Sequence, residues 1–207
     1  MQASDYPDDV ARLVDVCHRF GERGWCSATS GNFSVRIDDA HCLITQSGRD
    51  KSRLVDEDLM ICDMNGEALD AQCKPSAETP LHCRLYELDP SIGAVLHTHS
   101  VASTLLSKHG GKRLRISGLE MQKALAGMTT HADEVAVRIF ANDQDMTALS
   151  EKLRDAWQAG DIRVPGFLIA GHGLYAWGRD LDEARRHVEG FEFLFECRWQ
   201  ESLAGLS

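Results

Sequence analysis

The stretch from Phe33 to Thr45 contains two short runs of strand-forming residues separated by a polar pair. Apolar and polar residues alternate from Phe33 to Ile37, and a second run extends from Cys42 to Thr45. Alternation is typical of a strand with one face toward a core, because successive side chains of a strand point to opposite faces. Asp38–Asp39 between the runs favours a turn. The stretch therefore predicts a β-hairpin, which constrains this region to an antiparallel sheet.

Further strands and helices are expected along the rest of the chain. Apolar runs bounded by turn residues predict strands at 59–62, 92–96, 135–140 and 166–170, the last continuing through 174–177. Apolar residues at three- and four-residue spacing predict helices at 10–20, 78–88, 146–157 and 181–203. The mixture predicts an α/β fold with a mainly antiparallel central sheet flanked by helices. No repeat or linker interrupts residues 1–207, so a single domain is expected.

Charge and composition exclude several classes of protein. The formal net charge is −10, which argues against nucleic acid as a partner, because such binding needs a basic face. No window approaches the roughly 20 apolar residues of a membrane helix. The seven cysteines contain no CxxC pair, and the acidic N-terminus does not resemble a signal peptide. We therefore expect a cytoplasmic protein with reduced thiols, no membrane contact and no nucleic-acid partner.

Three histidines follow predicted strands. His97 and His99 come directly after an apolar strand and share one face of it, so both can reach one ion. His172 lies at a corresponding place, between two glycines that allow close backbone approach. Three neutral imidazoles leave zinc an open position for substrate, as in catalytic zinc sites. The alternative is that all three are structural histidines, but their joint placement favours zinc.

Two carboxylates are candidates for proton transfer. Glu78 opens a predicted helix, where an acid is also explained by the helix dipole. Glu120 lies between Leu119 and Met121, where an unpaired carboxylate would have a raised pKa, although a solvated helix face explains it equally well. The pattern alone does not choose between them.

Three polar loops have the composition of phosphate-binding loops. They contain small residues whose backbone N–H groups and hydroxyls can face an anion, and two of them carry a cation. The loops are Ser30–Asn32, Ser47–Lys51 and Lys74–Ser76. Each alone is an ordinary turn, and the interpretation depends on finding all three ahead of the histidine pair.

Five motifs together resemble the class II aldolase and adducin family, in order and spacing and over almost the whole chain. They are TSGNFSVR, TQSGRDK, KPSAET, AVLHTHS and GHGLYAWG. The resemblance implies a three-layer catalytic domain spanning 1–207 in a homotetramer, with zinc on His97, His99 and His172 near a subunit interface. It also implies phosphate contacts from Gly31, Asn32, Ser47, Gly48 and Ser76, with Lys51 as a helper.

The resemblance leaves two activities to compare. The family's sugar-phosphate aldolases place their key glutamate at the position of Glu78, and its dehydratases place their acid–base residue at that of Glu120. The chain has no tyrosine after Tyr175, where some aldolases use one. This difference favours a lyase that removes water from a small phosphorylated keto-sugar. The segments KPSAETPLH, EMQKALAG and GHGLYAWGRDLDEA most resemble those dehydratases of the family whose substrate carries a methylthio group, in methionine salvage. The alternatives are an aldolase or 4-epimerase acting on fuculose or ribulose phosphate, and a non-catalytic interaction module with the same fold.

Overall fold

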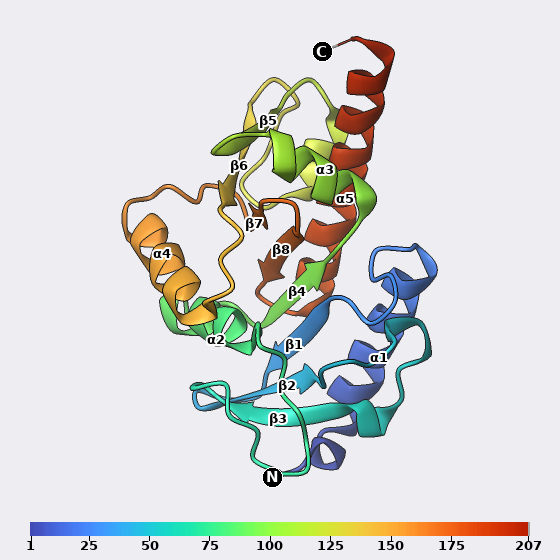
Figure 1. Ribbon diagram of the computed structural model, residues 1–207, viewed down its shortest axis with the longest axis vertical. Coiled ribbons are helices and arrows are strands. Elements are labelled where there is room, and N and C mark those ends of the chain that lie inside the picture. Colours follow the sequence, from blue (N-terminus) through green and yellow to red (C-terminus); the bar gives the residue numbers. More distant parts are fainter. Residues whose placement is uncertain (207) are drawn as a thin grey trace.

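The computed structural model describes residues 1–206 and contains one eight-stranded sheet (Figure 1). The strand order is β3-β2-β1-β4-β8-β7-β6-β5, and every neighbouring pair is antiparallel except β6 and β7. The strands are β1 Asn32–Arg36, β2 His41–Thr45, β3 Leu59–Asp63, β4 Ala94–Thr98, β5 Arg113–Ile116, β6 Val135–Phe140, β7 Gly166–Ile169 and β8 Gly173–Gly178. The predicted hairpin is confirmed as β1 and β2.

Helices cover both faces of the sheet. They are α1 Pro7–Glu22, α2 Thr79–Leu88, α3 Val101–His109, α4 Met146–Gln158 and α5 Leu181–Ala204. Apolar residues of α1, α3 and α5 pack into one buried cluster, and those of α2 and α4 pack into a second. Figure 1 shows α2 and α4 together on the side of the sheet opposite α5 and α1. The prediction of a mainly antiparallel sheet between helices is confirmed.

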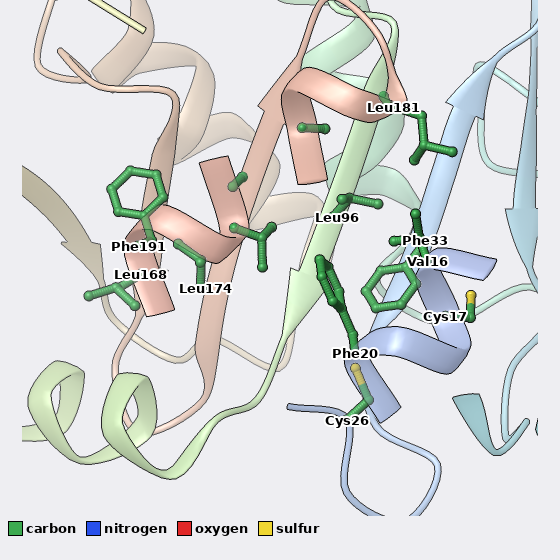
Figure 2. Close-up of a cluster of buried hydrophobic side chains, with 14 of the residues drawn as sticks. Val16, Cys17, Phe20, Cys26, Phe33, Leu96, Leu168, Leu174, Leu181 and Phe191 are labelled. Atoms are coloured by element: carbon green, nitrogen blue, oxygen red, sulfur yellow. The ribbon is translucent and has the colours of Figure 1, made fainter. Parts of the chain in front are cut away.

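The two clusters lie on opposite faces of the sheet. In β4, Leu96 lies in the cluster with α1 and α5, whereas Val95 lies in the cluster with α2 and α4. Figure 2 shows Leu96 with Phe20 and Phe33 in the first of these clusters. Since the pattern has a period of two, His97 continues on the face of Val95, toward α2. The face that carries the histidines is therefore fixed by the apolar residues that precede them.

Two expectations about elements were wrong or incomplete. Residues 174–177 do not continue the preceding strand: β7 and β8 pair antiparallel, and the chain reverses at Gly171, whose φ is 64°. This left-handed conformation is available to glycine without steric cost, which allows the tight reversal. The helix α3 was not predicted, because its buried residues include Ser103 and Ser107, which weaken the apolar pattern.

Short 3₁₀ helices connect several elements. They are Ala3–Asp5, Lys51–Arg53, Asp56–Asp58 and η4, Glu120–Ala124. Within residues 1–206, no helix is both long and apolar enough to cross a membrane.

Candidate active site

Two parts of the fold bring the three predicted histidines together. His97 lies at the end of β4, and His99 comes just after that strand. His172 lies in the turn between β7 and β8. The ring centroid of His99 lies 4.4 Å from that of His97 and 4.6 Å from that of His172. The structure thus gathers all three side chains that the sequence proposed as metal ligands.

Two glycines allow the backbone segments to approach this closely. A Cβ on Gly173 would lie 2.0 Å from the carbonyl oxygen of Thr98, so only glycine lets β8 lie against β4 here. Gly31 has a φ of 78°, and a Cβ there would lie 2.7 Å from the carbonyl oxygen of His97. Both positions require glycine, because a side chain at either one would collide with the backbone at His97 and Thr98.

Glu78, the N-cap residue of α2, joins the three histidines. Its Oε1 lies 2.9 Å from Nε2 of His172, and its Oε2 lies 3.6 Å from Nε2 of His97. One ligand atom from each of Glu78, His97, His99 and His172 lies within 4.8 Å of the other three. These four side chains form a set that could hold a metal ion. From the sequence, Glu78 was a candidate for proton transfer and not for metal binding.

The protonation of the histidines suits a metal. Nδ1 of His97 lies 2.8 Å from the carbonyl oxygen of Leu174, which can only accept, so this nitrogen carries a hydrogen and Nε2 is the nitrogen that faces Glu78 and His172. Nε2 of His99 is buried and has no hydrogen-bond partner among residues 1–206. Burial, with smaller contributions from His97 and His172, lowers the pKa of His99 to about 3, so its imidazole is neutral.

Glu78 supplies the negative charge of the cluster. Burial acts to raise the pKa of Glu78, but hydrogen bonds and charge interactions with His172 and His97 outweigh it and hold the pKa well below its usual range. A carboxylate with three imidazole nitrogens is a ligand set suited to a divalent transition metal. The orphaned nitrogen of His99 agrees with this fit, because a buried polar atom without a partner is costly.

A small cavity lies beside the cluster, with a volume of about 100 Å³. Glu78 and His99 form part of its wall. Five of the residues that the family resemblance assigned to phosphate line the rest: Gly31, Asn32, Ser47, Gly48 and Ser76. The backbone N–H of Ser47 donates to the carbonyl oxygen of Lys74 at 2.9 Å, which ties two of the three loops together. Ser30, from the first of the three predicted loops, also lines this cavity, and so do Thr29 and Gln46, which were not predicted.

Lys51 lies behind these loops and is not among the residues that line the cavity. Its side chain is buried, and Nζ donates to the carbonyl oxygens of Arg49 at 2.8 Å and Thr29 at 3.4 Å. Burial lowers the pKa of Lys51. Within the chain, this lysine therefore braces the backbone of two loops.

Glu120 lies apart from the cluster, at the start of η4. Its side chain is 70% exposed, and its carboxylate pairs with Lys123 and lies 3.3 Å from His131. The hydrogen bond from Lys123 lowers the pKa of Glu120. The expectation of an unpaired carboxylate with a raised pKa is therefore wrong for the single chain, because Glu120 is solvated and has a cation one turn away.

Comparison with known proteins identifies the relatives of this chain. Residues 11–199 match the model of the class II aldolase and adducin N-terminal domain. The chain is 53% identical over 195 residues to a methylthioribulose-1-phosphate dehydratase of Pectobacterium atrosepticum, covering 94% of this chain and 95% of that one. It is 50% identical over 192 residues to a protein of the same name from Serratia proteamaculans, covering 92% and 94%.

Solved structures agree in fold. The chain resembles the L-fuculose-1-phosphate aldolase of Thermus thermophilus with a TM-score of 0.73 and 28% identity, covering 94% of each chain. A sugar-phosphate aldolase from Thermotoga maritima shares the fold at a TM-score of 0.67 and 18% identity, over 95% of this chain and 96% of that one. With its sheet, its histidine cluster and its match over residues 11–199, this chain belongs to the class II aldolase and adducin family.

Proposed function

We propose that this protein is a zinc-dependent lyase that removes water from 5-methylthioribulose 1-phosphate. The product would be 2,3-diketo-5-methylthiopentyl 1-phosphate, formed as a step of methionine salvage. The observation that carries the proposal is the cluster of Glu78 and three histidines beside a polar cavity, in a chain about half identical to named dehydratases. We take residues 1–207 as one catalytic domain, since the family match spans most of them.

The metal would be held by Glu78, His97, His99 and His172. Zinc bound there supplies Lewis acidity, which makes the proton next to the substrate's carbonyl easier to remove. The protein's part is to aim the imidazoles at one point. The hydrogen bond from His97 Nδ1 to the carbonyl oxygen of Leu174 fixes one ring, and Tyr175 stacks on that ring at a centroid distance of 3.9 Å.

The cavity would receive the phosphate group. Gly48 has a φ of 75°, so the loop that carries Ser47 turns tightly and leaves small groups at the surface of the cavity. Hydroxyls of Ser47 and Ser76 and the amide of Asn32 can donate to phosphate oxygens. A phosphate bound here places the adjoining carbons of the substrate near His99 and Glu78, which share the cavity wall.

Elimination requires one proton to leave C3 and one to reach the hydroxyl that departs from C4. The C3–H and C4–O bonds break, water leaves, and the resulting enol becomes the C3 ketone. Glu78 is poorly suited to both transfers, since its two oxygens contact His172 and His97. We assign proton transfer to Glu120, whose carboxylate is exposed and free to approach a substrate bound to another subunit. Such a group contributes roughly 10²–10⁴ in rate.

A homotetramer with the active site near a subunit interface fits this assignment. Three exposed apolar side chains line one hollow on the surface: Val101, Met121 and Phe193, which are 70%, 40% and 48% exposed. Contiguous exposed apolar groups are typical of protein contacts. Met121 follows Glu120 directly, so a neighbouring subunit on this face would lie beside that glutamate.

One observation favours a second candidate, a sugar-phosphate aldolase or 4-epimerase. Glu78, which matches the aldolase acid–base position, is the glutamate that lies in the cluster, and an L-fuculose-1-phosphate aldolase shares the fold. This candidate uses the same metal site but breaks a different bond, so the products distinguish it.

Metal removal tests the proposed function. Protein stripped with a chelator should lose turnover of 5-methylthioribulose 1-phosphate, and added zinc should restore it, because the imidazoles alone cannot supply a Lewis acid. His99→Ala should lose both bound zinc and turnover, since a catalytic zinc site needs about three protein ligands. Full turnover by metal-free His99→Ala protein would refute the site.

A further inference from the structure

A chain of polar side chains runs beneath the candidate metal site, between α2 and β1. Tyr86 and His82 lie four residues apart on one face of α2, and Ser34 and Asn32 lie two residues apart on one face of β1. The hydroxyl of Tyr86 and Nδ1 of His82 both lie 2.7 Å from the hydroxyl oxygen of Ser34. All four residues are buried, with at most 3% of any one exposed.

The chain ends at Glu78. Nε2 of His82 is hydrogen-bonded to Oδ1 of Asn32, and Nδ2 of Asn32 donates to Oε2 of Glu78 at 2.6 Å. Tyr86, Ser34 and His82 do not line the cavity and do not belong to the metal-ligand cluster, so the roles described above leave them unused.

The direction of every hydrogen bond in this chain is determined by its neighbours. The Glu78 carboxylate can only accept, so the Asn32 amide must present N–H to it and its oxygen to His82. Nε2 of His82 must then carry a hydrogen. Burial lowers the pKa of His82 to about 3, so the ring is neutral and its Nδ1 can only accept from Ser34. The Ser34 oxygen in turn accepts from Tyr86.

We propose that Tyr86, Ser34 and His82 are positioning residues that lock the Asn32 amide in the orientation that holds Glu78 against the metal site. An asparagine amide can turn over by 180° with little change in shape. Turned over, Asn32 would set its oxygen against the Glu78 carboxylate and its N–H₂ group against the N–H of His82. The chain from Tyr86 opposes this flip, because it fixes the hydrogen on Nε2 of His82, so the bonds of Asn32 to His82 and to Glu78 would both be left unmade in a buried place. The inference deepens the proposed function by adding the groups that orient one of its metal ligands.

Removing a link should weaken zinc binding. Partners that orient metal ligands are commonly worth roughly 10–100-fold in metal affinity or activity. Ser34→Ala deletes the donor to His82, and His82→Phe deletes the donor to Asn32. We expect each to raise the zinc dissociation constant about 10-fold or more. Tyr86→Phe removes only the last hydroxyl of the chain and should act in the same direction with a smaller effect.

The experiment measures zinc affinity of the full chain by competition with a chelator of known affinity. Ser150→Ala is the matched control, because it also deletes a buried serine hydroxyl bond, to the carbonyl oxygen of Thr147, but on helix α4 and outside the chain of hydrogen bonds that leads to Glu78. Its zinc affinity should equal that of the unaltered protein. His82→Gln restores an N–H within reach of Asn32 and should regain most of the affinity that His82→Phe loses. Thermal unfolding shows which variants are folded. If His82→Phe is not folded, Tyr86→Phe replaces it as the test variant.

Unaltered zinc affinity in folded Ser34→Ala and Tyr86→Phe would overturn the inference. So would an equal loss in Ser150→Ala, or a His82→Gln variant that binds no better than His82→Phe, since packing rather than hydrogen bonding would then be the cause. The result is separable from the proposed reaction, because zinc alone is the probe. A protein that loses zinc affinity as expected but does not dehydrate the sugar would refute the reaction and leave this inference intact.

Discussion

At the scale of single residues, the two glutamates differ in what surrounds them. Glu78 is largely buried and contacts two imidazoles and an amide, whereas Glu120 is solvated and contacts only Lys123 and His131. A group fixed by three partners is suited to hold an ion, and a group on the surface is free to move protons. Their surroundings therefore imply different consequences when each is replaced.

Replacing each glutamate with glutamine should separate these roles. Glu120→Gln keeps the size of the side chain but cannot carry a proton, so kcat should fall by roughly 10²–10⁴ with bound zinc retained. Glu78→Gln replaces an anionic ligand with a neutral one, so zinc affinity should fall, and excess zinc should recover part of the turnover. Turnover and zinc content, measured on each variant, check the two predictions. A Glu120→Gln variant with a normal rate would refute the assignment of Glu120.

The sequence predicted the histidines better than the other site residues. His97 and His99 could be paired because the strand period puts them on one face, which is a local property. The place of Glu78 among them depends on where the start of α2 packs against β4, and no local pattern encodes that. The burial of Lys51 and the solvation of Glu120 likewise depend on tertiary contacts, which no local sequence pattern encodes.

At the scale of elements, the hairpin and most helices followed from periodicity and turn residues, as β1–β2 and α5 illustrate. The β7–β8 hairpin was misread as one strand, since Gly171 and Gly173 were interpreted only as allowing close approach. Both properties of glycine apply here, because Gly171 allows the chain to reverse and Gly173 allows β8 to lie close against β4. Residues of all three polar loops meet in one cavity, and the role of these loops in binding phosphate stays a prediction.

Placing a negative charge in these loops tests their role. Ser47→Asp and Ser76→Asp should each raise KM for the phosphorylated substrate by roughly 10-fold or more, because like charges a few ångströms apart repel by about 1–4 kcal/mol. Zinc content should not change. Ser91→Asp, on an exposed loop outside the cavity, is the matched control and should behave as the unaltered protein. Unchanged KM in both cavity variants would mean that the phosphate binds elsewhere.

At the scale of the whole molecule, the single chain separates the metal cluster from the proton-transfer group assigned to it. A symmetric oligomer can reunite them, since each subunit then offers its surface glutamate to a neighbour's cluster. The exposed apolar residues beside Glu120 mark the face on which such a contact would form.

Complementation between two inactive variants tests this arrangement. His99→Ala lacks the metal site, and Glu120→Gln lacks the proton-transfer group. Co-expressed, they should form mixed oligomers in which roughly a quarter of the sites combine an intact cluster with an intact Glu120 from the neighbour. Measurable turnover in the mixture, absent from either variant alone, is the expected result. No turnover in confirmed mixed oligomers would mean that both groups must come from one chain.

The central claim is the reaction itself, and product identification tests it most directly. The zinc-loaded protein, incubated with 5-methylthioribulose 1-phosphate and analysed by mass spectrometry, should give one phosphorylated product that is lighter than the substrate by one water. Retention of the whole carbon chain is expected because the C4–O bond breaks and no carbon–carbon bond does. Two smaller fragments, or an epimer of unchanged mass, would contradict the dehydratase and indicate the aldolase or epimerase.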